Sequence, residues 1–400
     1  MRIGFYTNCY KPRINGVVRS IAVFRQALLN LGHEVHLFAP AAPGYLDDEP
    51  DVYRYPALPW DNNALYRLAL PFSRRLGKLS ADLHLDVIHS HHPAMLGWVA
   101  ARHARRAGIP LVFTLHSQYQ HYGAYLPVGG RVVRAVSRQA VVRYMALCQR
   151  IIAPTSAARD QVLRDAPALA GRVVVLPTPL PVEAFPGVVS RDLRTKYGLD
   201  EHFTFAVVSR LSAEKGLSEL LQAIASLRRR RDDVRLLILG DGPEREDLET
   251  EAIELRIDDA VIFAGMVPFS QVAAHLQAAD AFVFTSRVEA QGLVLNEAMA
   301  VGLPVVAYDA PFIRDIIVDG QNGLLARPHY RALAIKMATL VDHEELRRNL
   351  AAQGLVTARR YGAEERAQQL ACIYEDAVAQ LRSDTLARSI GSTGESAEGV

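Results

Sequence analysis

The fold is indicated most clearly by residues 2–38, RIGFYTNCYKPRINGVVRSIAVFRQALLNLGHEVHLF. Its two ends, RIGFY at 2–6 and EVHLF at 34–38, are short apolar runs with the length of buried strands. The apolar residues between them recur at the spacing of one helical face: Ile21, Phe24, Leu28 and Leu31. Gly32 ends this helix, and a strand, a helix and a second strand in this order indicate a parallel sheet.

The same alternation continues along most of the chain. Further strand-like runs in the first half are DVIHS at 86–90, LVFTL at 111–115 and RIIAP at 150–154. The segment LPTPLPVEAFP at 176–186 carries four prolines, which neither a central strand nor a helix interior accepts, and it separates two similar patterns. The later strand-like runs are TFAVVSR at 204–210, VRLLILG at 234–240, AVIFAG at 260–265, AFVFTS at 281–286 and PVVAY at 304–308.

We therefore predict an α/β protein with two Rossmann-like, doubly wound domains that face a central cleft. The domains are expected to be residues 1–178 and 179–382, with the last helices free to pack back on the first domain. The Ser/Gly/Glu-rich tail at 383–400 has no apolar periodicity and is expected to be disordered. Open parallel sheets bind ligands outside the carboxyl ends of their strands, so we expect the chemistry in that cleft.

The composition agrees with a two-domain globular protein. The 400 residues, half of them apolar, exceed what one hydrophobic core usually absorbs. Cys9, Cys148 and Cys372 match no metal or disulfide framework, and no apolar secretory segment precedes the first strand. No run reaches about 18 consecutive apolar residues, the least that crosses a bilayer as a helix. We expect a cytoplasmic protein whose membrane contact is peripheral, on the inner face of the cell membrane.

The net charge of +2 conceals an asymmetry between the two halves. Residues 1–180 hold 21 Lys and Arg against 10 Asp and Glu, whereas the remainder holds 24 against 33. A basic half attracts nucleic acid, anionic lipid or phosphate, although a solvated arginine-rich surface explains the charge equally well. No nucleic-acid recognition motif accompanies the charge, so no nucleic-acid partner is expected.

The stretch EAQGLVLNEAMAVGLPVV at 289–306 is typical of a site for a nucleoside diphosphate sugar. Gly292 lets the backbone approach a ligand, and the helix that follows it points free N–H groups at an anion such as a diphosphate. Glu289 and Glu297 could then accept hydrogen bonds from hydroxyls on either side of that diphosphate. Two glutamates at a helix start are equally explained by the helix dipole. The residues that begin this helix are Leu293 and Val294.

The stretch VSRLSAEKG at 208–216 places Arg210 at the end of a strand and Lys215 five residues later. A guanidinium and an ammonium at a strand's carboxyl end can neutralise a leaving diphosphate as its charge develops. The alternative is that both are ordinary surface cations.

In order and spacing, these motifs resemble the retaining glycosyltransferases of family 4, which have the glycosyltransferase-B fold. The resemblance spans nearly the whole chain and implies transfer of a hexose from a nucleoside diphosphate donor without a cofactor or a metal. No D-x-D motif, which metal-dependent transferases of the other common fold use, occurs in the chain. The matching pieces are INGVVRSI at 14–21, VFTLH ending at His116, VSRLSAEKG, GDGP at 240–243, the two glutamates and GLPVVA at 302–307.

The resemblance also implies a role for each residue of the donor site. Glu297 would bind the ribose of the nucleotide, and Glu289 would contact hydroxyls of the donor sugar. Arg210 and Lys215 would hold the diphosphate. Gly16, in the loop after the first strand, would supply backbone N–H groups to it, and an Asn-Gly turn without a Cβ fits that role. Taken alone, Gly16 is equally an ordinary turn.

His116 ends the strand LVFTL, and in the family a histidine at this position lies near the donor sugar. We expect it to position the sugar and stabilise the transition state, while a structural hydrogen bond is the alternative. EAQGL and HSQYQHYGAYLP depart from the commonest family pattern and are similar to the branch that glucosylates diacylglycerol. In that branch tyrosines follow the histidine, and Tyr119 and Tyr122 would suit a lipid headgroup or simply order an aromatic loop.

The segment YRLALPFSRRLGKL at 66–79 combines apolar residues with Arg74, Arg75 and Lys78, as interfacial segments that attract anionic lipid do. A core-facing stripe with a solvated basic face explains it almost as well. We therefore expect a UDP-hexose donor, with glucose or galactose, and a membrane lipid such as diacylglycerol or its monoglycosylated form as acceptor. The alternatives are a soluble family 4 transferase acting on a polysaccharide or small molecule, and a noncatalytic protein that binds sugar nucleotides.

A nicotinamide oxidoreductase, which also uses doubly wound sheets, is disfavoured. Its dinucleotide site needs the G-x-G-x-x-G turn directly after the first strand, and YTNCYKPRINGVV lacks that turn.

Overall fold

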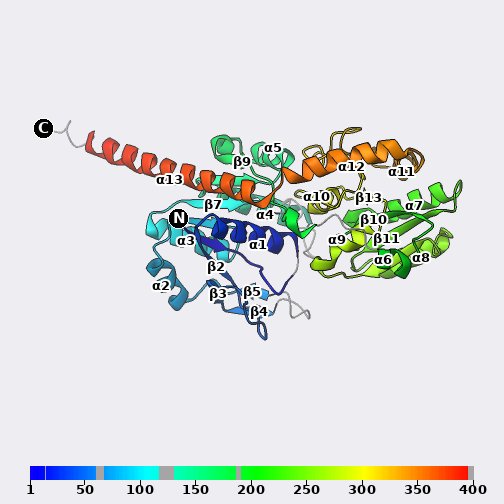
Figure 1. The fold of residues 1–400 in the computed structure, drawn as a ribbon. Coiled ribbons are helices and arrows are strands. Elements are labelled where there is room, and N and C mark those ends of the chain that lie inside the picture. Colours follow the sequence, from blue (N-terminus) through cyan, green and yellow to red (C-terminus); the bar gives the residue numbers. More distant parts are fainter. Residues whose placement is uncertain (14, 60–66, 117–129, 186–190, 395–400) are drawn as a thin grey trace. The chain divides into compact units, whose positions relative to one another are not determined.

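Parallel strands form the core of both halves of the chain. The computed structural model describes residues 1–13, 15–59, 67–116, 130–185 and 191–394. The chain divides into two units: unit 1 holds Met1–Pro179 together with the residues from Ala363 onward, and unit 2 holds Leu180–Gly362. Figure 1 shows each unit as strands flanked by helices.

Unit 1 contains a seven-stranded parallel sheet in the order β3-β2-β1-β6-β7-β8-β9. The strand order reverses between the adjacent strands β1 and β6, which is where doubly wound sheets bind ligands at their carboxyl ends. The strands are β1 (Arg2–Tyr6), β2 (Glu34–Pro40), β3 (Val52–Tyr55), β6 (Val87–Ser90), β7 (Leu111–Thr114), β8 (Arg150–Ala153) and β9 (Val173–Val175), with a separate antiparallel hairpin of β4 (Ala57–Pro59) and β5 (Arg67–Ala69).

Helices cover the sheet of unit 1. One core cluster joins strands of this sheet to α1 and α13, and another joins the sheet to α3 and α4. The central strands are buried along nearly their whole length, so consecutive residues are buried without alternation. The helices are α1 (Gly16–Asn30), α2 (Arg74–Asp82), α3 (Leu96–Ala107), α4 (Gly130–Met145), α5 (Ser156–Asp165) and α13 (Ala363–Gly394), and a 3₁₀ turn η2 spans Pro167–Arg172.

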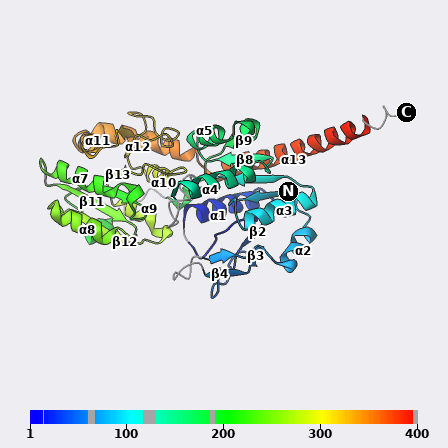
Figure 2. The ribbon, with the colours of Figure 1, turned by 180° about the vertical axis from the view of Figure 1, so that it is seen from behind.

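The C-terminal helix α13 belongs to unit 1 and packs on α1 (Figures 1 and 2), which is the return to the first domain that we had allowed for the last helices of the range 179–382. The reason is an apolar stripe that is buried with the residues of α1: Ala367, Leu370, Tyr374 and Ala377. The helix also continues to Gly394, where we had expected disorder from residue 383. There Thr385 and Ser383 donate their hydroxyls to carbonyls one turn earlier, so these residues do not interrupt the helix.

Unit 2 contains a six-stranded parallel sheet in the order β12-β11-β10-β13-β14-β15, whose strand order reverses between β10 and β13. The strands are β10 (Phe203–Val208), β11 (Val234–Leu239), β12 (Val261–Gly265), β13 (Ala281–Phe284), β14 (Val305–Tyr308) and β15 (Leu324–Ala326). The helices are α6 (Arg191–Lys196), α7 (Leu217–Arg228), α8 (Arg245–Glu254), α9 (Phe269–Gln277), α10 (Leu293–Ala300), α11 (Tyr330–Asp342) and α12 (Glu344–Arg359), with 3₁₀ turns η3 (Val182–Ala184) and η4 (Ala213–Lys215).

The architecture confirms two Rossmann-like α/β units. Each predicted strand is present, with bounds that differ from the prediction by at most two residues. Strands of three or four residues at the sheet edges, such as β3, β9 and β15, were not predicted, because so few residues show no periodicity. Among the residues that the structure describes, no helix is long and apolar enough to cross a membrane.

Candidate functional site

The predicted donor residues of unit 2 follow two adjacent strands. Arg210 and Lys215 come after β10, and Glu289 comes after β13. Because β10 and β13 are neighbours at the reversal of the strand order, the segments that leave their carboxyl ends lie against each other. The hydroxyl of Thr285 donates a 2.7 Å hydrogen bond to the carbonyl of Lys215 and so joins the two segments.

Lys215 and Glu289 form an ion pair. The Nζ of Lys215 donates to Oε1 of Glu289, and the hydroxyl of Ser286 donates to the same oxygen at 3.2 Å. The side chain of Lys215 is 17 % exposed and that of Glu289 is 25 % exposed, so both charges are partly shielded from water. Two of the charges that we predicted to act on the donor therefore neutralise each other here.

Glycines let the loops of this site approach closely. Gly216 follows Lys215 with a φ of +67°, and a Cβ there would lie 2.9 Å from the carbonyl oxygen of Thr285. Gly240, the first residue of the GDGP motif, has a φ of +137°, and a Cβ there would lie 1.8 Å from the carbonyl oxygen of Ser209. Any larger residue at either position would push these loops apart.

Arg210 is exposed beside the ion pair. Its charge reaches the neighbouring carboxylate of Glu214. Burial raises the pKa of Glu214, but its hydrogen bond with Ser212 and the charges of Lys215 and Arg210 outweigh burial and lower the pKa overall. At the carboxyl end of β10, Arg210 and Lys215 therefore lie close to two carboxylates, those of Glu214 and Glu289.

The N-terminus of α10 lies in the same segment. Gly292 precedes it with a φ of +78° and has no side chain with which to cap the first N–H groups of the helix, those of Leu293 and Val294. The first N–H groups of a helix and its dipole favour an anion at this end. Glu297, one turn into the helix, is only 1 % exposed, so its side chain is buried.

Asn296 was not identified from the sequence. It is 1 % exposed, and neither atom of its amide has a hydrogen-bond partner among the described residues. A buried amide without a partner costs free energy, on the order of 1–3 kcal/mol, so the polar group needs an explanation. The available indication was a polar residue within the apolar run LVLNEAMA.

In unit 1, His116 pairs with a second histidine. It follows β7, and its Nε2 lies 2.9 Å from Nδ1 of His91, which follows the adjacent strand β6. His89, within β6, is held by the hydroxyls of Tyr374 and Thr114 at 2.7 Å each. The predicted residue His116 is thus part of a histidine cluster, which the run HSHH at 89–92 could have indicated.

Both members of the His91–His116 pair are neutral at neutral pH. Burial disfavours the imidazolium form and, together with the neighbouring histidines, holds the pKa of each well below 6.5. One ring must then donate the shared proton and the other must accept it. A neutral, oriented imidazole suits hydrogen bonding to a substrate better than it suits donating a proton.

Gly16 begins α1 and is exposed. Asn15 caps the helix by accepting a 2.9 Å hydrogen bond from the backbone N–H of Val18. The loop before it is tied to the histidine cluster, because the backbone N–H of Asn8 donates to Nδ1 of His92 at 3.1 Å. The predicted phosphate-binding turn and the histidines therefore belong to one connected region at the carboxyl ends of β1, β6 and β7.

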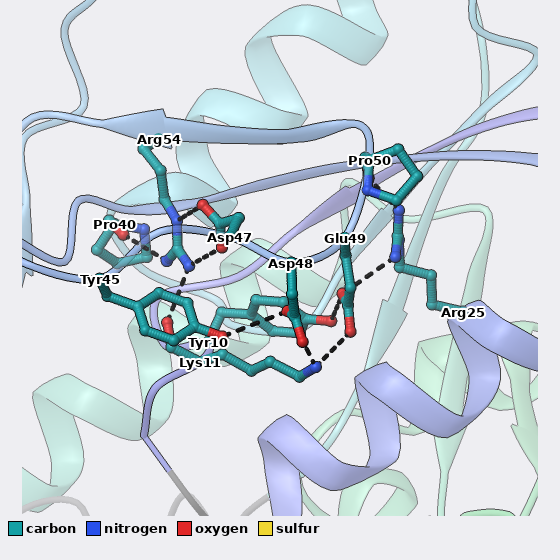
Figure 3. A network of polar contacts seen from close by, with 10 residues as sticks. All are labelled: Tyr10, Lys11, Arg25, Pro40, Tyr45, Asp47, Asp48, Glu49, Pro50 and Arg54. Atoms are coloured by element: carbon teal, nitrogen blue, oxygen red, sulfur yellow. Dashed lines mark hydrogen bonds and ion pairs between the residues drawn. The ribbon is translucent and has the colours of Figure 1, made fainter.

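A polar network holds this loop against α1 (Figure 3). Glu49 accepts hydrogen bonds from Tyr10 at 2.5 Å and Arg25 at 3.0 Å and pairs with Lys11 at 2.6 Å. Arg54 donates to Asp47 and, at 2.9 Å, to the carbonyl of Lys11. The network was not predicted, although Arg25 lies on the apolar face of α1 and is only 3 % exposed.

Only some of the predicted acceptor residues lie in the described part of the chain. Tyr119 and Tyr122 lie outside the described residues. Arg74, Arg75 and Lys78 lie on α2, all exposed.

Comparison with known proteins gives the family. Residues 14–184 match the family model "Glycosyltransferase Family 4", and residues 189–355 match "Glycosyl transferases group 1". The chain is 32 % identical over 336 residues to alpha-monoglucosyldiacylglycerol synthase of Streptococcus pneumoniae, covering 81 % of this chain and 75 % of that protein. The chain belongs to glycosyltransferase family 4.

Other relatives of this family 4 glycosyltransferase carry different names. A GDP-mannose-dependent alpha-mannosyltransferase of Mycolicibacterium smegmatis is 28 % identical over 371 residues, which cover 90 % of this chain and 93 % of that one. The crystal structure of Anabaena HepE in complex with UDP has the same fold, with a TM-score of 0.74 and 21 % identity over 93 % of this chain and 98 % of that chain. The predicted glycosyltransferase-B fold and the assignment to family 4 are confirmed.

Proposed function

We propose that this glycosyltransferase transfers a hexose from a UDP-sugar to a membrane lipid, with retention of configuration and without a metal ion. The observation that carries the proposal is the Lys215–Glu289 pair at the carboxyl ends of β10 and β13, close to the glycine-preceded start of α10. Cationic groups, free N–H groups and a carboxylate are what a nucleoside diphosphate sugar requires of its site.

Binding of the donor would replace the ion pair between Lys215 and Glu289 by contacts of each residue with the donor. The diphosphate would take Lys215 and Arg210, together with the N–H groups at the start of α10. Glu289 would then be released to accept hydrogen bonds from sugar hydroxyls, and Glu297 would accept them from the ribose. Gly16 would add backbone N–H groups from unit 1. The two cations supply the positive charge that a divalent ion supplies in other transferases, which supports a metal-independent reaction.

Retention follows from how the leaving group is stabilised. Arg210 and Lys215 favour departure of the diphosphate, so the acceptor hydroxyl could attack from the face that the diphosphate leaves. His116, kept neutral beside His91, would hydrogen-bond the sugar on the reacting side and stabilise the transition state. The product from an α-linked donor would be an α-glycoside.

A lipid acceptor is supported by the charge of the first half and by the relatives. The S. pneumoniae relative is named for a glucosylated diacylglycerol, and the cations of α2 would draw the protein to an anionic surface. We propose diacylglycerol or its monoglycosylated form as the acceptor, with peripheral binding to the inner face of the cell membrane.

The test is turnover of UDP-glucose with vesicles of phosphatidylglycerol that contain diacylglycerol, followed by proton NMR of the first product. We expect an α-anomeric signal, turnover that resists EDTA, and none with GDP-mannose. Lys215→Ala should abolish most turnover, while Lys196→Ala, at an exposed position of α6, should not. A β-linked product refutes retention. A soluble glycan used equally well without vesicles refutes the lipid acceptor and leaves glycosyl transfer standing.

A further inference from the structure

A hollow of about 1000 Å³ lies between α2 and α3 in unit 1. The two helices are neighbours in both ribbon views (Figures 1 and 2). The lining also includes His84, which precedes β6, and Ile109, which precedes β7. His91 and His116 follow the opposite, carboxyl ends of these two strands. The hollow is therefore separate from the histidine pair.

Positive charge borders this hollow. The described residues that line it include no carboxylate and include the cations Arg74, Lys78, Arg102 and Arg106. Within the described part of the chain, none of the four forms an ion pair. The Nε of Arg102 is buried and has no hydrogen-bond partner there. Cations that lie together without carboxylates repel one another, so an anion bound among them would be stabilised by all of them.

The remaining lining is largely apolar. Leu85 and Ile109 line the hollow, and Phe72 stands at it with 75 % of its surface exposed. An exposed phenylalanine beside cations suits a ligand that has both a charged and an apolar part.

Two polar side chains of the lining, those of Ser80 and His103, are joined through Tyr6, which does not itself line the hollow. The hydroxyl of Tyr6 hydrogen-bonds with the hydroxyl of Ser80 at 2.8 Å and with Nδ1 of His103 at 2.9 Å. Burial, with the charges of Arg102 and Arg106, lowers the pKa of His103 to about 4, so this ring is neutral at physiological pH. His103 therefore adds no charge to that of the arginines and the lysine.

A second hollow, of about 490 Å³, continues along α3 and shares Arg102 and Ile109 with the first. Its lining includes Trp98 and Leu147, which are 48 % and 47 % exposed. Tryptophan is favoured where one side of a surface is apolar and the other is wet. The α2–α3 face thus joins two hollows, exposed apolar side chains and unpaired cations.

We propose that the hollow between α2 and α3 binds one anionic phospholipid. The phosphate would lie among Arg74, Lys78 and Arg106, and an acyl chain would lie along Phe72 and Ile109. The site shares Arg74 and Lys78 with the cations of α2 that the proposed function assigns to membrane attraction, so the inference deepens that part of the proposed function. Its occupancy can be measured without any glycosyl transfer, so failure of lipid binding would leave the donor site and glycosyl transfer standing.

The direct test is isothermal titration calorimetry of the full chain with dihexanoyl phosphatidylglycerol below its micellar concentration. We expect saturable binding of one molecule. Dihexanoyl phosphatidylcholine, which carries no net charge, and glycerol 3-phosphate, which has no acyl chain, should each bind at least 10-fold more weakly. Equal affinity for glycerol 3-phosphate would show a phosphate site and refute the lipid. Equal affinity for phosphatidylcholine would refute the role of the cations.

Variants of one glycine separate filling of the hollow from damage to α2. A Cβ at Gly77 would meet only the Nε2 of His103, at 3.8 Å, so Gly77→Ala should fold and bind normally. Gly77→Leu places a longer side chain in the hollow and should weaken phosphatidylglycerol binding at least 10-fold, with the thermal unfolding curve showing that the protein remains folded. Unchanged binding by folded Gly77→Leu would refute the site.

Charge variants complete the test. Lys78→Ser and Arg106→Ser should each weaken phosphatidylglycerol binding several-fold. Arg143→Ser removes the same charge from an exposed position on α4 and should have no effect. If Arg143→Ser weakens binding as much as the other two, general surface charge and not the hollow attracts the lipid, and the proposal fails.

Discussion

Replacing Lys215 by alanine tests the donor site at its most informative position. Lys215 ends the turn η4, and its ammonium is held by Glu289 while its carbonyl is held by Thr285. The substitution removes the charge without removing the backbone contact. Because the side chains are only 17 % and 25 % exposed, loss of the pair should cost about 1–3 kcal/mol of folding free energy, less than for a fully buried pair. The variant should therefore remain folded.

The effect on catalysis should be at least as large as the effect on stability. The interaction energy between two unit charges about 4 Å apart is about 4 kcal/mol at an effective dielectric constant of about 20. The side chain of Lys215 is 17 % exposed, and only part of the diphosphate charge develops in the transition state. About 3 kcal/mol remains, which corresponds to a loss of roughly 100-fold in kcat.

The assay is steady-state release of UDP from UDP-glucose with saturating acceptor, which separates kcat from KM. We expect the loss mainly in kcat, with Lys196→Ala as the matched control. Glu289→Ala should lose a similar amount, and the double variant should lose much less than the product of the two, since both residues act on one donor. A folded Lys215→Ala with near-normal kcat would show that the donor diphosphate lies elsewhere.

Three further predictions concern other parts of the chain. Glu297→Ala should raise KM for the donor at least 10-fold with less effect on kcat, because it would remove ribose binding; an unchanged KM contradicts this. Lowering the pH from 7 to 4 should destabilise unit 1, because burial lowers the pKa of His89 to about 3 and burial, with the charge of Arg13, that of His92 to about 4. Unfolded, both would bind a proton below about 6.5, so the free energy of unfolding should fall by about 1.4 kcal/mol per pH unit for each histidine. Urea unfolding at several pH values measures this, and a flat profile refutes it. Arg25→Met should lower the free energy of unfolding by about 3–5 kcal/mol, because it removes the buried cation that pairs with Glu49. Arg159→Met, at an exposed position, should change the free energy of unfolding little in the same urea assay.

The sequence was sufficient for properties that depend on neighbouring residues. Buried strands are short apolar runs, and helices between them repeat every three to four residues, so both could be located from the pattern alone. The motif that we interpret as a donor site was also recognisable in the sequence, because Gly292, Glu289 and Glu297 belong to one strand-turn-helix segment. The positions of Arg210 and Lys215 could be predicted in the same way, because both lie in the segment that follows one strand.

Tertiary structure alone decided which distant groups meet. His91 contacts His116 because β6 and β7 are adjacent in the sheet, and no periodicity in the sequence encodes strand order. Arg25 of α1 contacts Glu49, which lies between β2 and β3, because these two segments pack together in the tertiary structure. The stripe of α13 could have packed on either unit, since an apolar face specifies burial and not a partner. The hollow between α2 and α3 likewise exists only where two helices fail to fill the space between them, which depends on the packing of side chains that are distant in the sequence.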